Sequence, residues 1–178
     1  MDAMESTRSD TSMITDPSVS RPSFEKLYPT LAYLKQYQPG PMRKLESYHS
    51  KIARFREELI APSALEIERA AHEKAGYLPQ DILRRACDLQ LFSSTVPDGL
   101  GGLGLPMIGI PTIAEEIAAG CLGVANLLFV NMLGVAAIGA TLDFKTVARV
   151  LPRTIDRERE GRPYFIATAL TEPGAGSD

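Results

Sequence analysis

The sequence predicts a mainly α-helical bundle followed by the first strand of a second, β-rich domain. Two observations predict this fold class. Apolar residues recur at helical spacing through residues 41–160, and this periodicity stops after Gly161, where the β-prone run Tyr164–Ile166 begins. The 178 residues are 44% hydrophobic, which is enough to bury one sizeable core. We therefore expect one complete helical domain and the start of another.

Three regions are expected along the chain. Residues 1–40 form an N-terminal extension, disordered at first because it is acidic and Ser/Thr-rich, then arm-like where residues 24–38 suggest a short amphipathic helix interrupted near Pro29. Residues 41–160 form the helical domain. Residues 161–178 form the first strand and a loop of an incomplete β-domain.

The first long helix is predicted by a single apolar stripe. Its members follow one another at helical spacing: Leu45, Tyr48, Ile52, Phe55 and Leu59. Pro62 then predicts a kink or a restart of the helix. A second helix is expected around Ile82 to Leu89, with Pro79 in its first turn.

Three more helices complete the predicted bundle. The third spans about 111–119, with Glu115 and Glu116 facing outward, and the fifth spans 144–156. The fourth, residues 124–140, is apolar on all sides and is expected at the centre of the bundle. It is about 17 residues long, below the roughly 20 that span a bilayer, so we interpret it as a buried core helix.

Charge and cysteine content narrow the function classes. The net charge is −3 with both signs interspersed, which argues against nucleic acid and anionic membranes as partners. Cys87 and Cys121 lie in apolar contexts typical of buried free thiols. The N-terminus has neither an apolar signal region nor an Arg-rich, acid-poor composition. A cytoplasmic protein is the expectation.

Two apparent motifs have simpler interpretations. The run Gly99–Gly104 satisfies G-x-G-x-x-G, but Pro106 and Pro111 disturb the helix that a dinucleotide site requires, so a tight interhelical turn is favoured. His49 and His72 have no Cys or acidic neighbours at metal spacing, which predicts surface histidines and no metal site. The mixed charges at 156–160 predict a solvated helix end.

The C-terminal segment Ala167–Asp178 suggests a ligand loop. It places two glycines and three hydroxyl groups after the expected strand, and glycines let a backbone approach a flat or anionic ligand closely. From these residues alone, a ligand loop is only slightly favoured over a tight turn.

Four motifs resemble those of the acyl-CoA dehydrogenase family and follow one another in the same order along the chain. Residues 169–178 (ALTEPGAGSD) are similar to its flavin-loop signature over almost their full length. Residues 55–62 resemble its first-helix motif, residues 97–105 its Pro-x-x-x-Gly-Gly-x-Gly turn and residues 114–118 its third helix. Together they cover about residues 43–178 in the family's order.

The resemblance implies a flavin site and an acyl-CoA site. Leu170 and Thr171 would contact the flavin ring of FAD, Thr168 its face, and Gly176 and Ser177 its pyrophosphate. Ser177 would also reach the acyl-CoA substrate. The residues that would line the acyl channel lie on the fourth helix: Phe129, Met132 and Leu133.

The implied function is the N-terminal portion of an FAD-dependent acyl-CoA dehydrogenase, which oxidises the CH–CH bond of an acyl thioester in fatty acid or lipid metabolism. Residues 141–151 lack the family's usual Glu-x-x-Gln-Lys stretch, and no acidic residue here matches its catalytic glutamate. We therefore expect the chain to be inactive without a missing C-terminal part or a second polypeptide, in a homo- or hetero-oligomer. Two alternatives stay open: a non-catalytic helical interaction module, and an acyl-CoA oxidase or flavin monooxygenase of the same fold.

Overall fold

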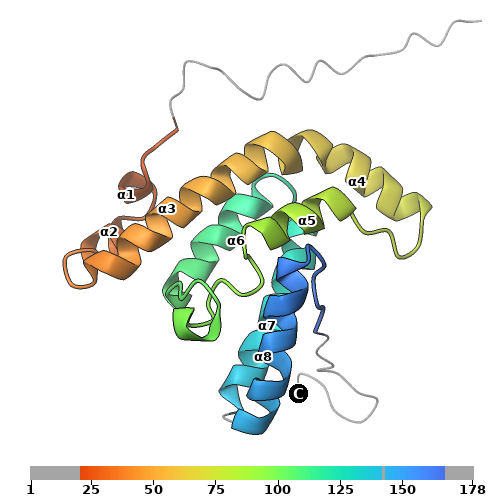
Figure 1. The fold of residues 1–178 in the computed structure, drawn as a ribbon. Coiled ribbons are helices and arrows are strands. Elements are labelled where there is room, and N and C mark those ends of the chain that lie inside the picture. Colours follow the sequence, from red (N-terminus) through yellow and green to blue (C-terminus); the bar gives the residue numbers. More distant parts are fainter. Residues whose placement is uncertain (1–20, 142, 167–178) are drawn as a thin grey trace, which may run out of the picture.

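The computed structural model describes residues 21–141 and 143–166, and the regular structure in these ranges is helical (Figure 1). The predicted helical bundle is therefore confirmed for this part of the chain. The α-helices are α1 (Phe24–Leu27), α2 (Pro29–Leu34), α3 (Pro39–Phe55), α4 (Ala61–Glu73), α5 (Gln80–Asp88), α6 (Ile110–Ala118), α7 (Leu122–Ala140) and α8 (Phe144–Arg159). One π-helical turn, η2 (Arg56–Ile60), and two 3-10 turns, η3 (Asp98–Leu100) and η4 (Met107–Gly109), join them.

Helices α3 and α4 form one long curved rod, seen along the top of Figure 1. Between them, in η2, the N–H of Ala61 donates to the carbonyl of Arg56, five residues earlier. Pro62 has no N–H, and its ring crowds the preceding turn, so a widened turn lets the helix continue past it. The kink expected at Pro62 is thus a π-bulge.

One core holds the bundle together. Helix α6 packs against α3 and α7, and α5 packs against α8. The predicted stripe of α3 faces this core: Leu45, Tyr48, Ile52 and Phe55 are buried, and Leu59 is partly buried against them. On α5, Ile82, Leu83 and Ala86 are buried as expected.

Helix α7 is less covered than its composition predicts. By length and composition it could cross a membrane, although such a helix also occurs in the cores of soluble proteins. Val124 and Leu128 are buried, but Leu122, Val130 and Leu133 are 74%, 46% and 54% exposed. The expectation of a central, fully buried helix is therefore wrong for the described part of the chain, because α6 and α8 cover only part of its circumference.

The glycine-rich segment is a tight turn, as predicted. Gly101 and Gly104 have positive φ angles of 93° and 58°. The N–H of Gly104 donates to the carbonyl of Val96 at 2.7 Å, closing the turn. A methyl group at Gly102 would overlap the carbonyl oxygens of Ser93 and Val96.

A buried ionic cluster corrects two sequence predictions. His49 on α3 is only 3% exposed and Glu116 on α6 only 7%, although both were expected at the surface. Glu116 pairs with Arg21 and with Arg56 at 3.0 Å, and His49 Nε2 lies 3.4 Å from its carboxylate. Burial, together with the neighbouring Arg21 and Arg56, lowers the pKa of His49 to about 4. The cluster ties the N-terminal arm to α3 and α6.

Glu158 is a second buried carboxylate, within the charge run that was expected to be solvated. It is 2% exposed, and its oxygens accept hydrogen bonds from the N–H of Phe92 at 2.8 Å and from the hydroxyl of Ser93. Burial raises the pKa of Glu158 to about 7 despite these bonds. Burial also raises the pKa of the nearby Cys87 thiol to about 12, and Cys87 is the buried free thiol that its apolar context predicted.

The expected β-strand is not shown. Residues 162–166 follow α8 without regular secondary structure, and the rest of the expected strand lies outside the described residues.

The tight turn gives a stability prediction. Replacing Gly102 with alanine forces the turn to shift, so we expect Gly102→Ala to lower the free energy of unfolding by about 1–3 kcal/mol in urea titrations. A methyl group at Gly99 would meet no atom within 4 Å, which makes Gly99→Ala the matched control. Equal effects of both substitutions would contradict the close packing at Gly102.

The two buried ionisable groups predict opposing pH effects. Between about pH 4.5 and 6.5 the unfolded chain holds more protons at His49 and fewer at Glu158 than the folded chain. The titration of His49 therefore makes the free energy of unfolding rise with pH, and the titration of Glu158 makes it fall. The parent protein should show a nearly flat profile for the free energy of unfolding in this window.

Glu158→Gln should expose the His49 contribution. The glutamine oxygen can still accept from the N–H of Phe92, so we expect folding to survive and stability at pH 8 to be no lower than in the parent. From pH 4.5 to 6.5 the stability of this variant should rise by on the order of 1 kcal/mol. Chemical denaturation at several pH values checks this, and a profile as flat as the parent's would refute it.

Candidate functional site

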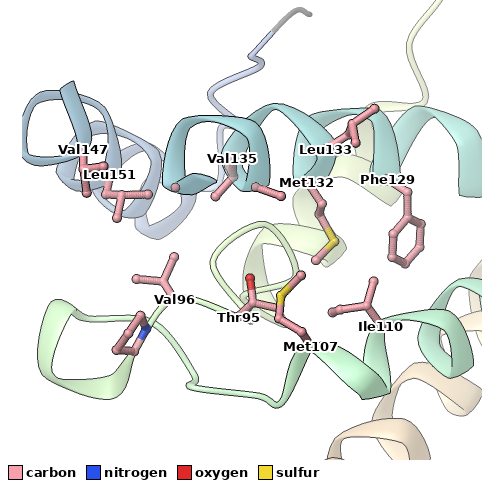
Figure 2. A pocket seen from close by; sticks show the side chains of 13 residues that line it. Thr95, Val96, Met107, Ile110, Phe129, Met132, Leu133, Val135, Val147 and Leu151 are labelled. Atoms are coloured by element: carbon pink, nitrogen blue, oxygen red, sulfur yellow. The ribbon is translucent and has the colours of Figure 1, made fainter. Parts of the chain in front are cut away.

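An apolar pocket opens between α7, α8 and the segment that leads into α6 (Figure 2). Its volume is about 470 Å³. The lining residues are Thr95, Val96, Pro97, Met107, Ile110, Phe129, Met132, Leu133, Val135, Ala136, Gly139, Val147 and Leu151.

The chemistry of the pocket suits a hydrocarbon chain. Among its described lining residues, Thr95 carries the one polar side chain and none is charged. Such a wall binds apolar groups by excluding water, and it offers no acid or base for proton transfer.

Helix α7 contributes the three residues that were predicted for the acyl channel. Phe129, Met132 and Leu133 all line the pocket, but their side chains point in different directions. In Figure 2, Phe129 and Met132 point into the space, toward Met107 and Ile110, whereas Leu133 points away at the rim. Met132 is 8% exposed, so it forms part of the pocket floor.

The opposite wall was not predicted from the sequence. It consists of residues 95–97, Met107 and Ile110, which lie in turns or at the very start of α6. Such residues show no apolar periodicity that would indicate which way they face. Val147 and Leu151 lie four residues apart on α8, and this i, i+4 spacing places both on the pocket side. No feature of the sequence indicated that they face a cavity.

The predicted flavin contacts lie outside the described residues. They are Thr168, Leu170, Thr171, Gly176 and Ser177. The last described residue, Ile166, lies against α7, where its side chain approaches Gly134.

A second hollow of about 610 Å³ lies between α4 and the start of α7. Its lining includes the exposed polar side chains of Glu68 and His72 beside Cys121, which distinguishes it from the uncharged wall of the first pocket. None of the predicted site residues reaches it. We therefore place the candidate site in the pocket of Figure 2.

Comparison with known proteins gives a consistent family. Residues 44–158 match the model of the acyl-CoA dehydrogenase N-terminal domain. The chain is 32% identical over 138 residues to mitochondrial isovaleryl-CoA dehydrogenase of Solanum tuberosum, covering 75% of this chain and 31% of that protein. It is 29% identical over 127 residues to benzylmalonyl-CoA dehydrogenase of Aromatoleum aromaticum, covering 71% and 31%.

A third relative is (2S)-methylsuccinyl-CoA dehydrogenase of Cereibacter sphaeroides, 27% identical over 140 residues, covering 78% of this chain and 24% of that protein. The chain thus spans about a quarter to a third of the length of these curated relatives. The family model covers most of the helical bundle, including α7 and the wall of the pocket. This chain belongs to the acyl-CoA dehydrogenase family and carries its N-terminal helical domain.

Proposed function

We propose that this chain is the N-terminal portion of an FAD-dependent acyl-CoA dehydrogenase and that it supplies the acyl pocket and one side of the flavin site. The observation that carries the proposal is the uncharged pocket on α7, lined by the residues expected to contact the acyl chain. We further propose residues 41–160 as the helical domain, residues 161–178 as the start of a β-domain, and residues 1–40 as an extension.

FAD would be held by the segment after Ile166. Thr168, Leu170, Thr171, Gly176 and Ser177 offer the hydroxyl and backbone donors that a flavin ring and a pyrophosphate accept. The pocket itself, with its single hydroxyl group, fits a hydrocarbon chain and not a dinucleotide. Bound FAD would supply the hydride acceptor for dehydrogenation at the acyl β-carbon.

The described residues would bind and orient the substrate. Val96, Ile110 and Met132 would exclude water from the acyl chain and hold it in a fixed direction. Removal of the α-proton requires a base, which the family resemblance implies is a carboxylate, and no acidic side chain lines the pocket among the described residues. We therefore expect the base to come from another part of the protein or from a second polypeptide, and the isolated chain to be inactive.

Exposed apolar side chains of α7, such as Leu122 and Val130, favour contact with further protein, in a homo- or hetero-oligomer. The relative from Solanum tuberosum is named as a mitochondrial protein, so the expected cytoplasmic location of this chain stays a prediction.

Flavin uptake tests the proposed function. The chain would be purified alone and together with any product encoded directly downstream, and its visible absorbance recorded. We expect a yellow protein when the second product is present, and bleaching of that colour by an acyl-CoA thioester. A folded protein that stays colourless in both preparations would contradict the proposal and favour a non-catalytic interaction module.

Phe129 gives a prediction about acyl-chain length. Its ring points into the pocket and occupies space that a longer chain would need (Figure 2). We expect Phe129→Ala in the flavin-loaded protein to tighten binding of long acyl-CoA thioesters relative to short ones by about tenfold, since each added methylene that becomes buried contributes about 0.8 kcal/mol.

Val130→Ala is the matched control, because Val130 also lies on α7 but is exposed and does not line the pocket. Binding constants for thioesters of increasing chain length provide the measurement. An unchanged length preference in Phe129→Ala would show that the ring does not limit the channel.

A further inference from the structure

The segment that follows α8 is attached to α7 at two adjacent points. We call residues 162–166 the exit segment; it is the dark blue trace beside α7 and α8 in Figure 1. The side-chain oxygen of Asn131 accepts the N–H of Ile166 at 2.7 Å. One helical turn further, a methyl group at Gly134 would stand 2.6 Å from Ile166 Cγ2, so only glycine allows this close approach. The ring of Phe165 packs edge-on against Phe92, with ring centroids 6.2 Å apart.

Burying the side-chain amide of Asn131 in an apolar helix is energetically unfavourable. It is 1% exposed, and its side-chain NH₂ group has no hydrogen-bond partner within the described residues. A buried amide with an unused donor is less stable than an apolar side chain of similar size. The bond to Ile166 is therefore the evident gain from an asparagine at this position.

The acyl pocket and the exit segment lie on different sides of α7. Phe129 and Met132 point into the pocket (Figure 2). At about 100° per residue, Asn131 lies about 100° around the helix from Met132, and Gly134 lies about 140° from Phe129. One rigid helix thus carries the acyl pocket on one side and the attachment of the exit segment on an adjoining side. The attached residue, Ile166, comes two residues before Thr168 in the sequence.

We infer that Asn131 is a positioning residue for the flavin loop. Its amide oxygen and the bare backbone of Gly134 hold Ile166 on α7, which sets where the segment beginning at Thr168 starts relative to the acyl pocket. The inference rests on the proposed function, because it gives that segment the role of flavin loop.

The test compares Asn131→Leu with the parent protein and with Asn126→Leu, an exposed position on the same helix. Hydrogen exchange at the Ile166 amide is measured without flavin, and FAD affinity is measured in the preparation that takes up flavin. For Asn131→Leu we expect exchange at Ile166 to be about tenfold faster and the FAD dissociation constant to rise at least about tenfold. We also expect the thermal midpoint not to fall, which separates positioning from a purely structural role. Asn126→Leu should match the parent in all three measurements.

Two results would overturn the inference: unchanged exchange at Ile166 in Asn131→Leu, or parental FAD affinity despite faster exchange. If that variant does not fold, Gly134→Ala decides, because alanine favours the helix while its methyl group displaces Ile166. Parental FAD affinity in Gly134→Ala would then refute it. If the parent protein binds no flavin in any preparation, the proposed function is contradicted, and the flavin role of Asn131 is contradicted with it. Hydrogen exchange at Ile166 then still shows whether Asn131 anchors the exit segment.

Discussion

Helix α7 is apolar around its whole circumference, and much of the molecule is arranged to cover it. Buried Val124 and Leu128 face the core that α3 and α6 complete. A second side forms the wall of the pocket, and a third receives the exit segment at Asn131. What these contacts leave exposed, such as Val130, is apolar surface suited to further protein. One helix thus joins the core, the pocket and the attachment of the chain after α8.

Buried carboxylates connect parts of the chain that apolar packing alone would leave loosely joined. Glu116 joins the N-terminal arm, through Arg21, to α3 and the π-helical turn, and Glu158 joins the end of α8 to the turn after α5. Burying a charge is unfavourable unless hydrogen bonds or opposite charges compensate it. Two arginines compensate the charge of Glu116, whereas the hydrogen bonds to Glu158 only partly offset its burial, which raises its pKa. Glu158 also stands near the turn whose residues 95–97 form one wall of the pocket.

The pocket has an apolar wall and, among its described lining residues, no acid or base. A hydrocarbon-lined cavity without an acid or base can hold and orient an acyl chain but cannot remove its proton. The chain belongs to the acyl-CoA dehydrogenase family. Under the proposed function, the helical domain would provide the substrate channel, and flavin and base would act from other parts of the site. In that arrangement the path from α7 to the flavin loop matters as much as the pocket, since the reacting groups must meet at a fixed distance.

Helix content, helix order and the tight glycine turn could be predicted from the sequence alone, because they depend on local periodicity and on residues such as Pro62 and Gly101 that restrict or free the backbone. Phe129 and Met132 could be named only through the family resemblance. The burial of His49, Glu116 and Glu158 could not be predicted, because their partners lie far away in the chain; Glu158 and Phe92 are 66 positions apart. Tertiary structure also decided which sides of α7 are covered, since a helix that is apolar all round carries no periodic signal for its orientation.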